Sequence, residues 1–244
     1  MQTQIRIPAS PILLATLSWV GLTIIFSYVI SAATGHSPVC NPFIDGCTTI
    51  SSTGMHYPAA YFYDFGLIAG PALMSVTWLL IAGWLSNTAG GKLPKPVIIS
   101  IIASTVGVFS LSLGEAFLPI EIHTKQIVHV AFTAIFFLTH ILSVFYLTFF
   151  ISYLKAKGTS KKITPKLIFT IAVKEMPLKI VCIIVLVFLT IVSLQSEPIL
   201  NDKAVEWCAS FAILFWVGSF YRNLKGYYLT VGSGDDNTVS TTKV

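Results

Sequence analysis

The stretch from Ile127 to Leu154, IVHVAFTAIFFLTHILSVFYLTFFISYL, contains no Asp, Glu, Lys or Arg and is followed at once by Lys155. A bilayer core of about 30 Å requires about 20 apolar residues in a helix that rises about 1.5 Å per residue. The stretch is therefore long enough to span a membrane. Its ionisable interruptions are the histidines His129 and His140, set among apolar, aromatic and hydroxyl side chains.

Five further stretches have a similar character, namely Pro11–Ala32, Phe65–Leu85, Pro96–Leu118, Pro177–Leu194 and Ala204–Leu224. The one that starts at Pro177 is the shortest, and Met176-Pro177 indicates a helix break just before it. Of the 244 residues, 55% are hydrophobic and 10% are charged, whereas soluble domains contain about 25% charged residues. This composition excludes a soluble enzyme, a disordered protein and a nucleic-acid-binding domain. The predicted fold class is all-α, a polytopic membrane protein with six transmembrane helices.

The basic residues indicate the orientation of these helices, because the cytoplasmic loops of membrane proteins are enriched in Lys and Arg. If the six stretches span in turn, all of the 15 basic residues except Lys125 and Lys203 fall on one side. The opposite side carries Asp45, Glu121, Glu197 and Asp202. Both termini are therefore predicted to be cytoplasmic. The net charge of +5 reflects this topology rather than affinity for an acidic partner, and no nucleic acid is expected.

The expected domain organisation is a single transmembrane domain over residues 1–231, with an outer loop at 33–64 and a cytoplasmic loop at 155–176. Residues 232–244 are rich in Gly, Ser, Thr and Asp and are predicted to form a disordered cytoplasmic tail. The small residues Ser31-Ala32-Ala33 leave a cleaved signal peptide as an alternative to an uncleaved first helix. The apolar stretch before them is about twice the usual signal-peptide length, which favours the uncleaved helix.

The outer loop contains Cys40 and Cys47, on the side of the membrane that is normally oxidising. We predict a disulfide between them, because C-x6-C is not a usual zinc spacing. The pairs Asn41-Pro42 and Asp45-Gly46 supply turns inside this ring, whose closure contributes about 2.5 kcal/mol on the chain-entropy estimate. Beyond the ring, Ile50-Ser51-Ser52-Thr53-Gly54 either turns backbone N–H groups toward an anionic headgroup or forms a plain turn.

Four ionisable residues are predicted to lie at a similar depth near the outer interface, on four different helices: Asp64, Glu115, His129 and Glu206. Carboxylates within a membrane usually face the bundle interior, so we predict one polar site that opens outward. His140 lies three helical turns further in than His129 on nearly the same face, with Thr133 between them. These residues either extend the site toward mid-membrane or, in the case of His140, only hydrogen-bond to a neighbouring helix. No histidine spacing is diagnostic of a metal site, and no cofactor is expected.

Five short motifs follow one another along the chain: Asn41-Pro42-Phe43-Ile44-Asp45, Ile50-Ser51-Ser52-Thr53-Gly54, Tyr57-Pro58, His129 and Glu206-Trp207. Together with the span count and the cytoplasmic termini, they resemble the DRAM/Frag/Sfk family of six-span membrane proteins. The chain departs from the family pattern in two places. The Cys40–Cys47 ring separates Ile44-Asp45 from Ile50-Ser51, and Ala59-Ala60 stands where relatives have an acidic residue after the proline.

This resemblance implies a protein of the plasma membrane, of the endolysosomal membrane, or of the inner membrane if the source is bacterial. Relatives act in lipid-anchor remodelling, in phosphoinositide-kinase recruitment and lipid asymmetry, and in autophagy, without a shared catalytic chemistry. Because four ionisable groups are predicted to converge at one depth, we expect a non-enzymatic protein that binds membrane lipids, or a partner membrane protein, at its outer face and influences lipid organisation or signalling.

Two alternatives are a lipid-modifying enzyme that uses the carboxylates and His129, and a small proton-coupled transporter that uses His129 and His140. No recognisable spacing of nucleophile and base supports the enzyme. No paired inverted repeat supports the transporter.

Overall fold

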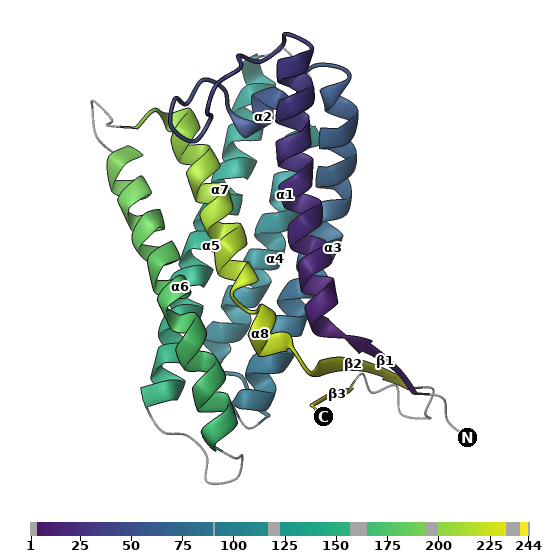
Figure 1. Cartoon of the computed structure of the whole chain (residues 1–244), viewed down its shortest axis with the longest axis vertical. Coiled ribbons are helices and arrows are strands. Elements are labelled where there is room, and N and C mark those ends of the chain that lie inside the picture. The colour runs from purple at the N-terminus through teal and green to yellow at the C-terminus, as the bar shows by residue number, and fades with distance from the viewer. Residues whose placement is uncertain are drawn as a thin grey trace.

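The computed structural model describes residues 4–89, 91–116, 123–156, 165–193, 200–232 and 240–243. Within them, six long helices run side by side and form the bundle in Figure 1: α1 (Ala9–Ala33), α3 (Ala59–Thr88), α4 (Lys95–Ala116), α5 (His123–Ala156), α6 (Pro165–Ser193) and α7 (Asp202–Gly218). A short helix, α8 (Tyr221–Leu224), follows α7. Five spans in the described chain are long and apolar enough to cross a membrane, and α6 adds a shorter apolar segment, Met176–Val192. The predicted class, an all-α polytopic membrane protein, is confirmed.

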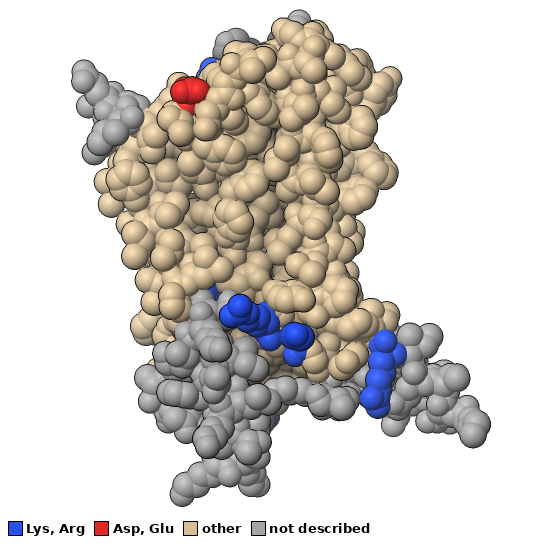
Figure 2. Space-filling model, viewed as in Figure 1, with Lys and Arg blue, Asp and Glu red and all other residues tan. Residues whose placement is uncertain are grey.

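The two ends of the bundle differ in structure and in charge. One end carries the short helix α2 (Ile50–Thr53) and the loop that contains the disulfide. The other carries a three-stranded antiparallel sheet of β1 (Gln4–Pro8), β2 (Tyr227–Gly232) and β3 (Ser240–Lys243), in the order β1-β2-β3. On the face shown in Figure 2, most basic side chains gather toward the end with the sheet, and the opposite end shows one small acidic area with a basic side chain beside it. By the positive-inside rule, the sheet end is the cytoplasmic end.

Three boundaries differ from the sequence-based expectations. Helix α3 begins at Ala59, so the outer loop ends before residue 64. Helix α6 begins at Pro165 and continues through Pro177, where a break was predicted. Proline is tolerated inside membrane helices because neighbouring helices and side chains satisfy the freed backbone groups. The tail predicted as disordered contains strand β3, which pairs with β2 from Tyr227↔Lys243 to Thr230↔Ser240; residues 233–239 and 244 lie outside the described chain.

The helices pack through small and hydroxyl residues as well as aromatic rings. The Thr16 and Thr77 hydroxyls hydrogen-bond at 3.0 Å between α1 and α3, where both side chains are buried. A Cβ atom on Gly66 would overlap the Thr23 side chain, so α1 and α3 approach closely at this point. Such close backbone approach stabilises helix pairs in lipid, where water does not drive their association.

Lys179 was predicted to lie on the cytoplasmic surface, together with the other basic residues of that side. The structure places its side chain inside the bundle instead. Its side chain is 2% exposed between α6 and the α7–α8 junction. The ammonium donates a hydrogen bond to the Ser219 hydroxyl and lies 3.9 Å from the centroid of the Phe220 ring. A cation at the C-terminal end of α7 is also favoured by the helix dipole.

Candidate functional site

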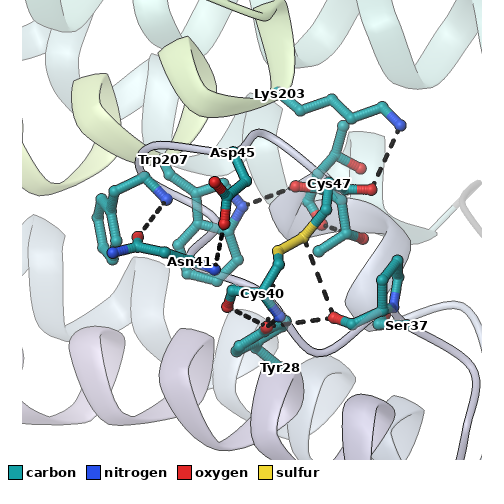
Figure 3. Close-up of a disulfide and its surroundings, with 12 residues drawn as sticks. Tyr28, Ser37, Cys40, Asn41, Asp45, Cys47, Lys203 and Trp207 are labelled. Atoms are coloured by element: carbon teal, nitrogen blue, oxygen red, sulfur yellow. Dashed lines mark hydrogen bonds between the residues drawn. A yellow bond between two sulfur atoms is a disulfide. The ribbon is translucent and has the colours of Figure 1, made fainter.

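The loop at the outer end is held in place by the predicted disulfide. Cys40 and Cys47 are bonded (Figure 3), and the Tyr28 hydroxyl donates to the Cys40 carbonyl at 2.7 Å. Within the ring, Asp45 accepts a hydrogen bond from the backbone N–H of Asn41 at 2.8 Å. The loop is therefore attached to α1 and stabilised internally.

The loop is also attached to α7. Trp207, which is buried, donates from Nε1 to the Thr48 carbonyl at 2.9 Å. Gly46 has a φ of 56°, and a Cβ atom there would lie 2.7 Å from Cβ of Asn201. Only glycine combines this left-handed conformation with such a close approach. These contacts fix the position of the residues that follow, including α2.

Helix α2 brings Ser51 into a group of buried and half-buried polar side chains. We call this group the polar cluster; it consists of Ser51, Tyr63, Glu115, His129 and Glu206. Thr49 caps the helix by accepting from the backbone N–H of Ser52 at 2.9 Å. Ser51 is buried, and its hydroxyl lies 3.1 Å from Nε2 of His129. His129 is held by its other nitrogen, since Nδ1 lies 3.1 Å from the Gly114 carbonyl. Because a carbonyl only accepts, Nδ1 carries the proton in the neutral ring, and Nε2 accepts from Ser51.

Two carboxylates complete the cluster. Glu115 is 6% exposed, and its Oε2 lies 4.0 Å from Nδ1 of His129. Glu206 lies within electrostatic reach of the backbone of Ile50 and Ser51, at the start of α2. Tyr63 contacts Glu115 and Ser51. The first two residues of the Ile50–Gly54 run thus act on a carboxylate of the same chain, whereas the N–H groups of Ser52 and Gly54 bond to Thr49 and Ser51.

The cluster lies beside two spaces that share part of their wall. An inner cavity of about 70 Å³ lies among α1, α2, α3, α4, α5 and α7, and Glu115, Tyr63 and Ser210 are part of its wall. A larger groove of about 850 Å³ lies between α5, α6 and α7. We call these the inner cavity and the lateral groove. Four residues line both of them: Ser51, Thr133, Phe137 and Glu206.

The structure brings together three of the four predicted site residues. Glu115 and Glu206 line the inner cavity, and His129 and Glu206 line the lateral groove. Thr133, predicted as part of a deeper extension, lines both. Asp64 is half-buried beside Tyr63 on α3 and lines neither space.

His140 also lines neither the inner cavity nor the lateral groove. It is fully buried, its Nδ1 lies 2.9 Å from the Phe136 carbonyl, and its ring packs against Trp78. The ring also lies beside α4, where a Cβ atom on Gly107 would be 3.3 Å from it, so His140 packs among α3, α4 and its own helix.

Two residues of the cluster were not predicted from the sequence. Ser51 lies in the Ile50–Gly54 run, whose sequence is compatible with both a headgroup site and a plain turn. Tyr63 belonged to an aromatic group expected to anchor at the interface, yet it is 1% exposed whereas Phe65 is 65% exposed. The alternation of buried and exposed positions along α3 was not recognisable because residues on both faces are aromatic.

A membrane-spanning bundle, an outer loop closed by a disulfide and an intramembrane polar cluster define this chain as a polytopic integral membrane protein. Residues 8–227 match the Frag1/DRAM/Sfk1/Cwh43P N-terminal domain family, and the chain therefore belongs to this family. Comparison with curated proteins and with solved structures gave no match.

Proposed function

We propose that this protein binds a lipid of the outer leaflet in the lateral groove, with the lipid headgroup at the polar cluster and an acyl chain between α5, α6 and α7. The single observation that carries this proposal is the groove itself. Its volume of about 850 Å³ falls within the range of about 300–1,000 Å³ that is typical of ligand sites.

The depth of the lateral groove suits a lipid tail. On α5 its wall extends from His129 to Ile141, which is about 18 Å at about 1.5 Å per residue. One leaflet occupies half of the hydrocarbon core, or about 15 Å. The groove therefore extends from the outer interface to about the middle of the bilayer.

The chemistry of the lateral groove changes along this depth. Thr49, Ser51, Ser52 and Glu206 contribute polar groups at the outer end. Deeper, the wall consists mainly of apolar side chains, including Leu138, Ile141, Leu186 and Leu189. This order matches the order of a lipid, in which a polar head precedes an apolar tail.

The groove is accessible to bilayer lipid from the side. Val130 and Leu138, on its α5 wall, are 63% and 60% exposed in the isolated chain. A lipid can therefore enter laterally, without passing through the outer loop. At the outer end, the wall is formed by Thr49, Ser51, Ser52 and Met55, which follow the disulfide-bonded ring.

The test fills the groove with one side chain. The protein is reconstituted in nanodiscs with equal parts of phosphatidylethanolamine, phosphatidylcholine and phosphatidylglycerol, each with a photoreactive diazirine on its acyl chain. Ala134, on the groove wall, is replaced in Ala134→Trp; the matched control is Ala131→Trp on the exposed face of α5 outside the groove. We expect cross-links to the groove residues in the wild type and in Ala131→Trp, and their loss in Ala134→Trp. Equal cross-linking in both variants would refute the proposal.

A lipid ester hydrolase is a second candidate, favoured by the 3.1 Å contact between Ser51 Oγ and His129 Nε2. In this reaction Ser51 Oγ attacks the ester carbonyl carbon, and His129 takes the hydroxyl proton and returns it to the departing alkoxide. Water then releases the fatty acid from Ser51. The candidate ranks second because Glu206 already lies within electrostatic reach of the backbone of Ile50 and Ser51, whose N–H groups would otherwise stabilise the oxyanion.

A fluorophosphonate probe tests this candidate directly. An active serine is labelled covalently, and we expect the label to depend on Ser51 and His129, so that Ser51→Ala and His129→Gln both abolish it. No labelling of the wild-type protein in nanodiscs rejects the hydrolase and leaves lipid binding in the groove unaffected.

A further inference from the structure

Two buried polar atoms at the inner cavity have no hydrogen-bond partner among the described residues. They are Oε2 of Glu115 and Oγ1 of Thr133, and both residues line the cavity. Buried polar atoms are nearly always paired with protein, water or ligand. These two atoms therefore identify the place where a hydrogen-bonding group of a ligand fits.

Apart from His129, whose Nδ1 lies 4.0 Å from Oε2 of Glu115, the side chains around this place that carry charge are acidic. The walls of the inner cavity and the lateral groove include the carboxylates of Glu115, Glu206 and Asp202. Neither wall contains a Lys or Arg side chain among the described residues. Acidic side chains stabilise a cationic group of a ligand. They repel an anionic group that has no cationic group beside it.

The volume of the inner cavity limits the size of the cationic group that it can hold. About 70 Å³ corresponds to about five to seven water-sized sites, at about 10–15 Å³ each. An ethanolammonium group fits this space. The larger trimethylammonium group of choline fills it and has no N–H to donate to Glu115 or Thr133.

We propose that the inner cavity binds the primary ammonium of a lipid headgroup, with phosphatidylethanolamine as the simplest ligand. This assignment rests on the proposed lipid binding in the lateral groove, because the groove delivers the headgroup to the shared wall at Ser51, Thr133 and Glu206. The ammonium has three N–H donors, two of which pair with Glu115 Oε2 and Thr133 Oγ1. The acyl chain then lies along the groove.

The experiment measures headgroup preference with the wild-type protein. Nanodiscs contain the diazirine-labelled lipid with one of five headgroups and the same acyl chains: ethanolamine, N-methylethanolamine, N,N-dimethylethanolamine, choline or glycerol. Cross-linking to the groove is expected to fall with each added methyl group and to be at least about tenfold weaker for choline and glycerol than for ethanolamine, since a charge-assisted hydrogen bond contributes about 1.5–3 kcal/mol. Equal cross-linking of all five lipids overturns the headgroup assignment but leaves the groove proposal standing.

Substitutions identify the carboxylate that causes the preference for the ethanolamine headgroup. Glu115→Gln is expected to reduce the preference for ethanolamine over choline by about tenfold, while the summed cross-linking of all lipids persists. Asp45→Asn, which also converts a carboxylate to an amide at the outer side but lies outside both walls, is expected to keep the preference. An unchanged preference in Glu115→Gln refutes the assignment of this carboxylate.

A final arm distinguishes a lipid headgroup from a soluble amine. Free ethanolamine is added at millimolar concentration to nanodiscs that contain labelled phosphatidylethanolamine. We expect no loss of cross-linking, because the acyl chain supplies most of the apolar burial. Full displacement by free ethanolamine overturns the lipid as source of the amine. Absence of groove cross-links for every lipid overturns the proposed function itself.

Discussion

The attachment of α2 to the bundle depends on one buried hydrogen bond that a single substitution removes. Trp207 donates from Nε1 to the Thr48 carbonyl at 2.9 Å, and its ring makes edge contacts with Tyr28 and Phe43. Trp207→Phe keeps an aromatic ring at this position and removes the donor. The Thr48 carbonyl is then left unpaired in a buried place.

The expected magnitude follows from the burial of Thr48, which is 5% exposed. An unpaired buried group costs about 1–3 kcal/mol. This free energy applies to the local opening of the loop and α2. At about 1.4 kcal/mol per factor of ten, it raises the equilibrium constant for this opening about 5- to 140-fold. We therefore expect the backbone amides of Ser52 and Gly54 to exchange with solvent about 5- to 140-fold faster in Trp207→Phe.

Hydrogen–deuterium exchange read by mass spectrometry in detergent micelles measures this effect on the α2 peptide. The matched control is Trp216→Phe, because Trp216 also donates a buried hydrogen bond, at 2.8 Å, but to Thr148 on α5. Trp216→Phe should leave exchange at α2 unchanged. Unchanged exchange at α2 in Trp207→Phe, or equal acceleration in both variants, would show that this hydrogen bond does not hold α2 in place.

Three further predictions concern stability. Replacing both Cys40 and Cys47 by Ser should lower the free energy of loop opening by about 2.5 kcal/mol. Limited proteolysis between α1 and α2 should then be faster than in the oxidised wild type and about as fast as in the reduced wild type; a rate equal to that of the oxidised wild type would contradict the role of the disulfide. Gly66→Ala should lower the thermal unfolding temperature, because overpacking costs about 1–3 kcal/mol. Gly70→Ala should not lower it, because the nearest atom to a Cβ there is 3.6 Å away. Equal effects of the two substitutions would contradict the close approach of α1 and α3. Lys179→Met should destabilise the cytoplasmic end by about 2 kcal/mol through loss of the cation–π contact, and an unchanged unfolding temperature would argue against that contact.

The membrane class and the helix count could be predicted because both depend on local composition. A run such as Ile127–Leu154 has no charged residue over a length that exceeds the bilayer core, so a helix is the only form that satisfies its backbone in lipid. Loop charges are equally local, and they predicted which end is cytoplasmic. The break at Pro177 was predicted incorrectly because packing against neighbouring helices lies outside the local sequence.

The depth of the candidate site residues could also be predicted, since each residue adds a fixed rise along a helix. Their direction around the helix axis could not. In a soluble helix the polar face marks the exterior, but a membrane helix is apolar on both its lipid-facing and its buried sides. Asp64 and Tyr63 are adjacent in sequence, yet the rotation of α3 directs Tyr63 into the cluster and leaves Asp64 outside it.

By itself, the sequence predicted the membrane class of this protein, the number of its long helices, its family and the disulfide, because these depend on composition and on short motifs. The tertiary structure decided that Glu115, His129 and Glu206 come together without Asp64, and that Ser51 joins them beside the inner cavity and the lateral groove. The physical reason is that this meeting requires the rotation of four helices and the folding of the outer loop onto α7, which arise from packing between segments far apart in the chain.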